Sequence, residues 1–184
     1  SVAYPVPAPP KLNTPVYSLA TANAAESSST NMNIVTYATP VSIEPSNWVI
    51  SLYQTSLSYE NFVREGKGVL QLLTKPQKSL VPLLGKSSGR EVEKCVESCT
   101  LGFEWEAAAG LDWSAPTTTM LGTEFMVLPG CNCYLAMEML DIVPSGDHDV
   151  ALCRLASVGV KGEGTEGGPP PVLSTQALRD AGII

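Results

Sequence analysis

The stretch Gln54–Ser58 has the composition of a phosphate site, because four of its five side chains are polar and uncharged. Ser58 is placed to cap a helix that begins at Tyr59, with Asn61 at the third helical position. Hydroxyl groups, free backbone N–H groups and the positive end of a helix dipole together bind phosphate. The stretch therefore predicts either a phosphate site or, as the simpler alternative, an ordinary capped helix.

His148 is the only histidine of the chain, and it follows directly on Gly146-Asp147. An imidazole forms hydrogen bonds through either nitrogen and changes its charge near neutral pH. Any Ser-His-Asp triad would have to use this residue, and the chain has no G-x-S-x-G nucleophile motif. It also has no glycine-rich dinucleotide motif and no P-loop. His148 is therefore either a site residue or an exposed strand residue after a hairpin turn.

The five cysteines favour a reducing compartment over a disulfide framework, because their number is odd. Cys95-x3-Cys99 and Cys131-x-Cys133 are spaced poorly for structural zinc, and only one histidine is available as a further ligand. We therefore predict no metal site and interpret the cysteines as small apolar or loop residues.

Two strands and the turn between them must position the polar stretch. The runs Asn33–Thr39 and Trp48–Tyr53 are rich in β-branched and aromatic residues, which favour strands. Pro40, Pro45 and Ser46 mark the connection between the runs. The order is then strand, turn, strand, polar loop and helix.

The remaining chain reads as further strands with a few short helices, which indicates a mainly β fold of the barrel or α+β class. Gly66, Gly85 and Gly182 are placed as helix ends. Pro144–Asp147 reads as a hairpin turn. The strands predicted are Val16–Ala22, Gly68–Thr74, Phe125–Leu128, Cys133–Val143 and His148–Val158. The helices predicted are Tyr59–Glu65, Ser79–Leu84, Arg90–Ser98 and Gln176–Ala181. The last helix is expected to be capped by Ser174 or Thr175.

Proline composition divides the chain into an extended arm over residues 1–14 and one domain over residues 15–184. Gly159–Pro171 reads as a linker before the last helix. Residues 99–123 form an apparent insertion that carries Phe103, Trp105 and Trp113. These aromatic residues are either a lid or subunit contact, or a satellite core under a long loop.

Composition excludes several classes of protein. The chain has 184 residues, 44% of them hydrophobic and 16% charged, which is typical of a globular domain. Its net charge of −7 argues against a broad surface for nucleic acid or anionic membranes. No run approaches the roughly 18 apolar residues of a membrane helix. A local phosphate site stays compatible with this charge, because a few N–H groups suffice to hold the anion.

The stretch Thr30–Phe62, which contains these two strands, the polar loop and the start of the helix, resembles the flavin reductase-like, FMN-binding split-barrel family. In that family a strand ends in a Ser/Thr-containing segment, followed by a serine, an acidic residue with proline, an apolar strand, a polar loop and a helix. The matching residues here are Tyr37-Ala38-Thr39, Ser42, Glu44-Pro45, Val49–Leu52, Gln54–Ser56 and Ser58. Gly146-Asp147-His148 is similar to the GDH motif of the NAD(P)H-dependent members, and the end of the chain resembles plant and cyanobacterial members.

This resemblance implies a set of site residues. Tyr37, Ala38 and Thr39 would lie along the isoalloxazine ring. The ribityl chain and phosphate would follow a run whose members are Ser51, Leu52, Tyr53, Gln54, Thr55 and Ser56, with Ser58 near the phosphate. His148 would be the catalytic residue, beside flavin and nicotinamide. The family often has a basic residue where this chain has Gln54, so Lys86 or Arg90 would have to supply the missing charge; both also read as solvated surface residues.

The resemblance further implies a homodimer that binds FMN, with FAD as the alternative flavin, and uses NAD(P)H as a transient substrate. Hydride would pass to flavin N5, in a reducing compartment such as the cytoplasm or a plastid. Two other functions stay open. One is a non-catalytic barrel that binds flavin or a tetrapyrrole as carrier or sensor. The other is an interaction module whose working surface is the Trp105–Trp113 segment, because a fold by itself does not determine a function.

Overall fold

The computed structural model describes residues 10–23, 29–114, 125–161 and 170–184. Its strands are β1 (Tyr17–Ala22), β2 (Thr30–Val35), β3 (Ala38–Ser42), β4 (Asn47–Tyr53), β5 (Lys67–Leu72), β6 (Glu106–Ala107), β7 (Asp112–Trp113), β8 (Met126–Val127), β9 (Cys133–Ser145) and β10 (His148–Val160). Its helices are α1 (Leu57–Glu65), α2 (Val81–Lys86), α3 (Lys94–Thr100) and α4 (Thr175–Asp180), with short 3₁₀ turns η1 (Lys75–Leu80) and η2 (Ala108–Gly110). The predicted mainly β class with short helices is confirmed.

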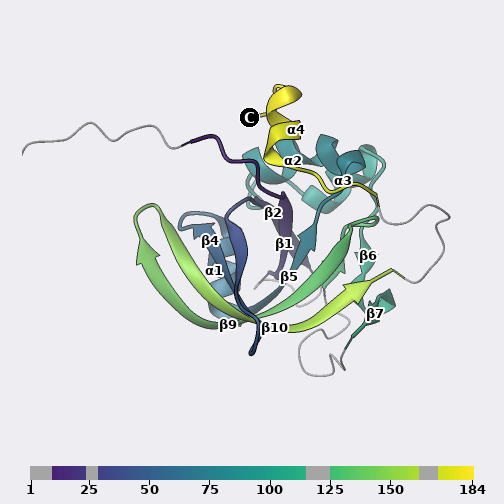
Figure 1. Cartoon of the computed structure of the whole chain (residues 1–184). Coiled ribbons are helices and arrows are strands. Elements are labelled where there is room, and N and C mark those ends of the chain that lie inside the picture. Colours follow the sequence, from purple (N-terminus) through teal and green to yellow (C-terminus); the bar gives the residue numbers. More distant parts are fainter. Residues whose placement is uncertain (1–9, 24–28, 115–124, 162–169) are drawn as a thin grey trace, which may run out of the picture.

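One antiparallel sheet organises the molecule, in the order β2-β1-β5-β9-β10-β4-β3, with β7 paired to β10. The sheet is strongly curved, and α2, α3 and α4 gather at one end of it (Figure 1). The β9–β10 hairpin is the longest pair of strands and extends beyond the other strands. A separate pair, β6 and β8, lies in the segment that follows α3.

Two apolar clusters cover the two faces of this sheet. The inner cluster joins Leu19, Ile50, Leu52 and Leu135 from three strands, β1, β4 and β9, to Phe62 of α1. The outer cluster packs the other face against α2, α4 and the segment after α3, and it includes Val16, Met32, Leu84, Trp105, Phe125 and Leu178. The buried strands β1 and β5 contribute to both clusters, because successive side chains of a strand point to opposite faces.

The predicted strand Asn33–Thr39 is wrong as a single element. β2 ends at Val35 and β3 begins at Ala38, so Thr36 and Tyr37 form a break between them. β2 pairs with β1, whereas β3 pairs with β4 at the other end of the strand order. One straight strand cannot reach both partners, so the chain turns at this break.

The helix boundaries also differ from the predicted ones. α1 begins at Leu57, and its N-cap is Ser56, whose hydroxyl accepts a hydrogen bond from the backbone N–H of Tyr59. The prediction that Ser58 caps a helix at Tyr59 is therefore wrong, and Asn61 is the fifth helical residue. Gly66 ends α1 with a φ of 67°, as predicted.

Three further boundaries lie elsewhere than predicted. α2 continues through Gly85 to Lys86, so Gly85 does not end it. α3 begins only at Lys94, because residues 90–93 form a turn and irregular chain. β10 runs to Val160, which places the start of the predicted linker inside a strand. The predicted capping of α4 by Ser174 is confirmed, since its hydroxyl accepts from the N–H of Ala177.

Residues near the two ends of the described chain are joined by hydrogen bonds. The backbone N–H of Thr14 donates to Oγ1 of Thr175 at 3.0 Å, and the N–H of Thr175 donates to the carbonyl of Thr14 at 2.9 Å. Arg179 of α4 donates to the carbonyl of Leu12 at 2.8 Å. The last part of the predicted arm is thus fixed against α4, and residues 1–9 of that arm lie outside the described residues.

The aromatic residues of the predicted insertion belong to the core where the structure describes them. Trp105 is 5% exposed and packs in the outer cluster, and Trp113 covers Gly159 of β10. This supports the alternative of a core under a long loop over that of an exposed working surface. Residues 115–124 of the segment lie outside the described residues. Over the described part of the chain, none of the helices has the length and apolar character needed to cross a membrane.

Candidate flavin site

Strand pairing brings three aromatic rings together at one corner of the sheet. Tyr53 ends β4 and lies directly opposite His148, which begins β10. Their ring centroids are 5.3 Å apart. Tyr37, in the break between β2 and β3, also contacts the imidazole, with ring centroids 5.9 Å apart in an edge-to-face geometry. Such distances are typical of favourable aromatic pairs. Tyr37 is 66% exposed and Tyr53 49% exposed, so both rings offer surface to a planar ligand.

Backbone hydrogen bonds fix this aromatic corner, defined by Tyr37, Tyr53 and His148. The N–H of Ser51 donates to the carbonyl of Tyr37 at 2.9 Å, which holds the break against β4. The N–H of Gln54 donates to the carbonyl of Asp147 at 3.2 Å, which holds the polar loop against the hairpin turn. The corner is therefore built by three segments that are distant in sequence.

Asp147 forms a hydrogen bond with the imidazole of His148. Its Oδ1 lies 2.8 Å from Nδ1 of His148, and the hydrogen bond from His148 is the main cause that lowers the pKa of the Asp147 carboxyl. The carboxylate is therefore ionised at neutral pH, and it can accept a hydrogen bond from Nδ1 of the imidazole.

A second carboxylate, Asp149, lies beneath the polar loop. It is buried, and it accepts hydrogen bonds from Nε2 of Gln54 and from the hydroxyl of Tyr59, both at 2.6 Å. The bond from Tyr59, followed by that from Gln54, lowers the pKa of Asp149, and the same contact raises the pKa of Tyr59. Asp149 thus carries a negative charge that orients Gln54 inward, away from any ligand of the loop.

The start of α1 offers hydroxyl groups and helix N–H groups. Ser56 caps the helix, and Thr55 before it is exposed. The first turn of a helix has N–H groups without partners inside the helix, and its dipole favours an anion. Ser58, in contrast, is buried, and its hydroxyl accepts a hydrogen bond from Nδ2 of Asn31 at 2.8 Å. Its side chain is part of the interior contact between α1 and β2.

Arg90 is the basic residue at this loop. Its Nη1 donates to the carbonyl of Thr55 at 3.2 Å, and its Nη2 lies 2.5 Å from Oε1 of Glu60 in α1. Lys86, the other cation considered from the sequence, donates to the carbonyl of Ile183 instead. Arg90 therefore brings a positive charge to the helix start that Gln54 does not supply.

Seven of the eleven predicted site residues meet at the corner and its loop, namely Tyr37, Ser51, Tyr53, Gln54, Thr55, Ser56 and His148. Gln54 is among them by position, but its side chain turns inward to Asp149, and the other four residues lie elsewhere or face the interior. Leu52 packs in the inner cluster, and Ser58 faces the interior. Ala38 and Thr39 lie on β3 opposite Ile50 and Val49, farther along the sheet from the corner.

Asp149 and Tyr59 were missed by the sequence analysis. Alternation along β10 carries the signal for Asp149, because Asp149, Ala151 and Cys153 are all buried and form one face of the strand. A carboxylate on an apolar strand face needs hydrogen-bond partners. The sequence does not show that these partners are Gln54 and Tyr59, since both are about 90 or more positions away.

All five cysteines lie in the described residues, and none of them forms a disulfide there. All five are free thiols, and burial raises the pKa of Cys131 and Cys153 to about 12. Such thiols are poorly reactive, because the thiolate is the nucleophile and the metal ligand. Within the described ranges, no group of three or more His, Cys, Asp or Glu side chains is arranged to hold a metal ion.

Comparison with known proteins relates the chain to flavoproteins. The family model described as "Flavin reductase like domain" matches residues 10–180. No curated protein sequence matches. Several solved structures share the fold. An FMN-binding protein from Thermus thermophilus is 18% identical over 92% of this chain and 96% of its own length, with a TM-score of 0.65. An NADH:FAD oxidoreductase from Streptomyces globisporus is 12% identical over 80% of this chain and 75% of its own, with a TM-score of 0.59.

A longer protein from Sinorhizobium meliloti 1021 has the same fold in part. It is 16% identical with a TM-score of 0.64, and this chain covers 46% of its length. At these identities the structures establish the fold alone, and they confirm the FMN-binding split barrel expected from the sequence. The family model covers nearly the whole chain, including the segment predicted to be an insertion. The protein therefore belongs to the flavin reductase-like domain family.

Proposed function

We propose that the protein binds FMN at the aromatic corner and catalyses flavin reduction by NAD(P)H. The observation that carries this proposal is the meeting of Tyr37, Tyr53 and His148 beside the N-terminus of α1. FMN carries a planar ring system and a phosphate group about one ribityl chain apart. Its site would therefore need an aromatic surface and a helix N-terminus side by side. The family membership supports the same function.

The residues of the corner fit a flavin mononucleotide. The exposed faces of Tyr37 and Tyr53 suit the apolar ring. Thr55, Ser56 and the first N–H groups of α1 suit the phosphate, with Arg90 as the cation beside them. Gln54 does not take part, since Asp149 holds its side chain. When bound, flavin supplies the redox chemistry by accepting hydride at N5.

The protein's own groups would position the reactants. His148 contacts both tyrosine rings, and its Nδ1 is engaged by Asp147, which leaves Nε2 as the ring nitrogen available to a ligand. From there it can donate a hydrogen bond to a flavin or nicotinamide oxygen. Asp147 keeps the ring in this orientation. The role of His148 is thus to orient the reactants, and it forms no covalent bond with them.

We also propose that the protein is a homodimer. Several large apolar side chains of the sheet are exposed, and Ile43 in the β3–β4 turn, at the opposite end of β4 from the corner, is 93% exposed. Leu140 and Val143 on the extended part of β9 are exposed as well. Exposed apolar side chains that gather near a site mark an interaction surface. Val143 lies opposite Val150, two residues from His148, so a second copy that covers this part of β9 would also shield one side of the corner from water.

The experiment is reconstitution of the purified protein with FMN, followed by anaerobic addition of NADH or NADPH. We expect a stoichiometric yellow complex in gel filtration and bleaching of its absorbance near 450 nm, a property of the flavin itself. Free FMN with the same nucleotide is the control for the uncatalysed reaction. Protein that retains no FMN would refute the proposal. A complex that neither nucleotide bleaches would assign the non-catalytic, flavin-binding function instead.

A further inference from the structure

One carboxylate connects the two parts of the proposed flavin site. Asp149 follows His148 directly in β10 and lies opposite Leu52 of β4. The imidazole contacts the tyrosines of the aromatic corner, whereas the Asp149 side chain is 6% exposed and contacts α1. Successive side chains of a strand point to opposite faces, which explains this difference. The residue next to the imidazole therefore reaches the helix that would hold the phosphate.

The two oxygens of this carboxylate hold two different segments. Oδ1 of Asp149 accepts a hydrogen bond from Nε2 of Gln54 in the polar loop, and Oδ2 accepts one from the hydroxyl of Tyr59 in the first turn of α1, both at 2.6 Å. Hydrogen bonds to an ionised group are roughly twice as strong as those between neutral groups. Thr55 and Ser56 lie between these two anchors, so the hydroxyl groups suited to a phosphate are fixed from both sides.

Other buried polar side chains of α1 bond to other strands. Ser58 accepts a hydrogen bond from Asn31 of β2, and Nδ2 of Asn61 donates to Oγ1 of Thr21 in β1 at 3.3 Å. The hydroxyl of Tyr59 instead joins the first turn of α1 to β10. The position of the helix start relative to the aromatic corner therefore depends on this bond.

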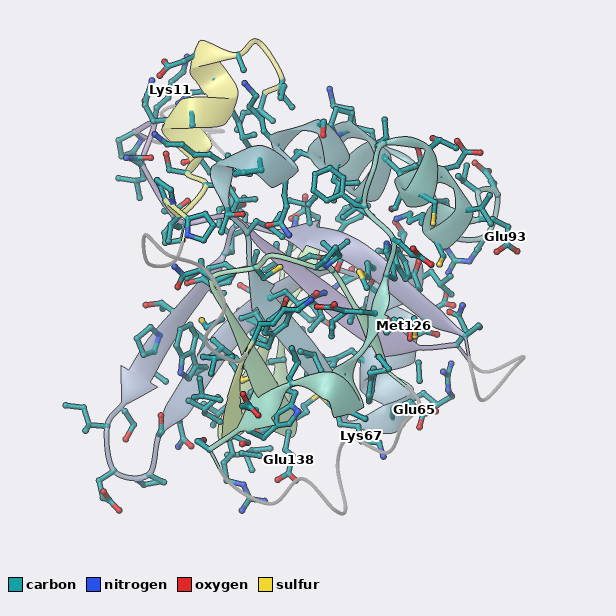
Figure 2. All side chains as sticks on the ribbon, turned by 90° about the vertical axis from the view of Figure 1, so that its right-hand side faces the viewer. Lys11, Glu65, Lys67, Glu93, Met126 and Glu138 are labelled. Carbon is teal, nitrogen blue, oxygen red and sulfur yellow. The ribbon has the colours of Figure 1, made fainter. Side chains whose placement is uncertain are left out.

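The far end of α1 is fixed by the main chain. The helix ends at Gly66, whose N–H donates to the carbonyl of Phe62 at 2.8 Å. Figure 2 shows Glu65, the last residue of α1, close to Lys67, with which β5 begins and which pairs with Glu138 of β9. This end passes directly into the sheet, whereas the start of α1 follows the polar loop. A side-chain contact therefore has more influence on the start, which is the end that would hold the phosphate.

We propose that Asp149 is a positioning residue for the flavin phosphate, which holds the start of α1 and the polar loop at the distance from His148 that FMN spans. The inference rests on the proposed function, since it places the flavin ring at the aromatic corner and the phosphate at α1. Asp149 itself does not touch the ligand, because Gln54 and Tyr59 occupy its two oxygens. Binding groups that are held in place before the ligand arrives lose little freedom on binding, which raises the affinity.

The charge of Asp149 has the opposite effect on phosphate binding. A carboxylate near a phosphate repels it, so charge alone would weaken FMN binding. If Asp149 acted only through its charge, every neutral replacement would strengthen FMN binding. If it acts through position, a replacement that keeps both hydrogen bonds preserves binding, and one that removes them weakens it. Riboflavin has the same ring and ribityl chain without the phosphate, so it separates an effect on the phosphate from an effect on the whole site.

The test uses replacements that keep or remove these hydrogen bonds. Asp149→Asn keeps the shape of the side chain, and its amide can accept from Gln54 through the oxygen and donate to the Tyr59 hydroxyl through the nitrogen. Asp149→Ala removes both bonds. Tyr59→Phe removes only the bond to α1, and it is the milder variant in case Asp149→Ala does not fold. Asn61→Ala is the matched control, because it removes a buried contact of α1 with β1 and leaves the contact with β10 in place.

Affinities for FMN and for riboflavin are measured by isothermal titration with the full chain, and the folding of each variant is checked by urea unfolding. We expect Asp149→Ala to weaken FMN binding about tenfold and Tyr59→Phe to weaken it about threefold, while riboflavin binding changes by less than about twofold in both. Asp149→Asn should retain the FMN affinity within about threefold. Asn61→Ala should lower the stability and leave the ratio of the two affinities unchanged.

Three results would overturn the inference and leave the proposed function intact. Equal losses for both flavins would mean that Asp149 supports the whole site and not the phosphate. Unchanged FMN binding in Asp149→Ala and Tyr59→Phe would mean that the helix start holds its position without this carboxylate. Tighter FMN binding in both Asp149→Asn and Asp149→Ala would mean that only the charge acts. Unmodified protein that binds no FMN would refute the proposed function itself.

Discussion

The buried Lys94 gives a quantitative prediction about the pH dependence of stability. Burial lowers the pKa of its amine from 10.5 to about 8, without a carboxylate in ion-pair contact among the described residues. Its Nζ has two carbonyl acceptors, Met32 O and Leu84 O. A neutral amine has two hydrogens, which these acceptors satisfy. The folded protein therefore prefers the neutral form of this side chain more than the unfolded chain does.

The sign of the effect follows from proton linkage. Between pH 8 and pH 10.5 the unfolded chain holds a proton at Lys94 that the folded chain has largely released. The free energy of unfolding then rises with pH, because the unfolded state binds more protons. A pKa difference of this size changes the free energy of unfolding by at most about 3 kcal/mol. Contact of the amine with solvent screens its charge and makes the change smaller. Below pH 8 the contribution is a constant penalty.

The assay is urea unfolding of the protein and of Lys94→Met at several pH values from 7 to 10.5, with a reductant present. Methionine keeps the length of the side chain and removes the titrating group. Other titrating groups, including Cys131 and Cys153, occur in both proteins and cancel in the difference. We expect the difference in unfolding free energy to grow with pH in favour of the lysine. Parallel curves for the two proteins would refute the reasoning about burial.

Three further predictions concern the aromatic corner and the helix start beside it. Ser56→Ala should lower the free energy of unfolding by about 1 kcal/mol through loss of the α1 cap, measured by urea unfolding; an unchanged value would mean that the cap bond to Tyr59 is not formed in solution. Arg90→Ala should weaken FMN binding about tenfold in a titration and leave riboflavin binding unchanged, because only FMN carries a phosphate. Equal losses for both ligands would argue against a phosphate contact. His148→Ala should slow anaerobic flavin reduction in stopped flow while FMN stays bound, and unaltered reduction kinetics would remove His148 from the mechanism.

The sequence predicted the local features of the fold well. The β9–β10 hairpin, the stop of α1 at Gly66 and the cap of α4 all depend on residues within a few positions of each other. Features that depend on distant partners were predicted less well. The run Asn33–Thr39 looks continuous, but it divides because β2 and β3 join strands at opposite ends of the sheet order. No local pattern contains that information.

The same distinction applies to the site. Ser56 and Ser58 are equally suitable helix caps by residue type. The choice between them involves two distant partners: Asn31 donates a hydrogen bond to the Ser58 hydroxyl, and Asp149 accepts one from the Tyr59 hydroxyl. Both partners are remote in sequence. The aromatic corner was anticipated through Tyr37, Tyr53 and His148 individually, but their contact depends on the register of β4 with β10. Arg90 and Lys86 were the two cations considered for the phosphate. Only the tertiary structure shows that Arg90 contacts the polar loop and that Lys86 contacts Ile183 instead.

The hydrogen bonds between residues 12–14 and α4 have a mechanical consequence. If the molecule were stretched between those two segments in an optical trap, the load would fall first on a short seam of bonds around Thr14 and Thr175, together with the bridge of Pro15 to Ser174. Antiparallel bonds at such a seam open one after another, whereas the long β9–β10 ladder would carry little of the pull at first. The extension trace should show a small early yield before the main rupture, and the aromatic corner should survive that first event.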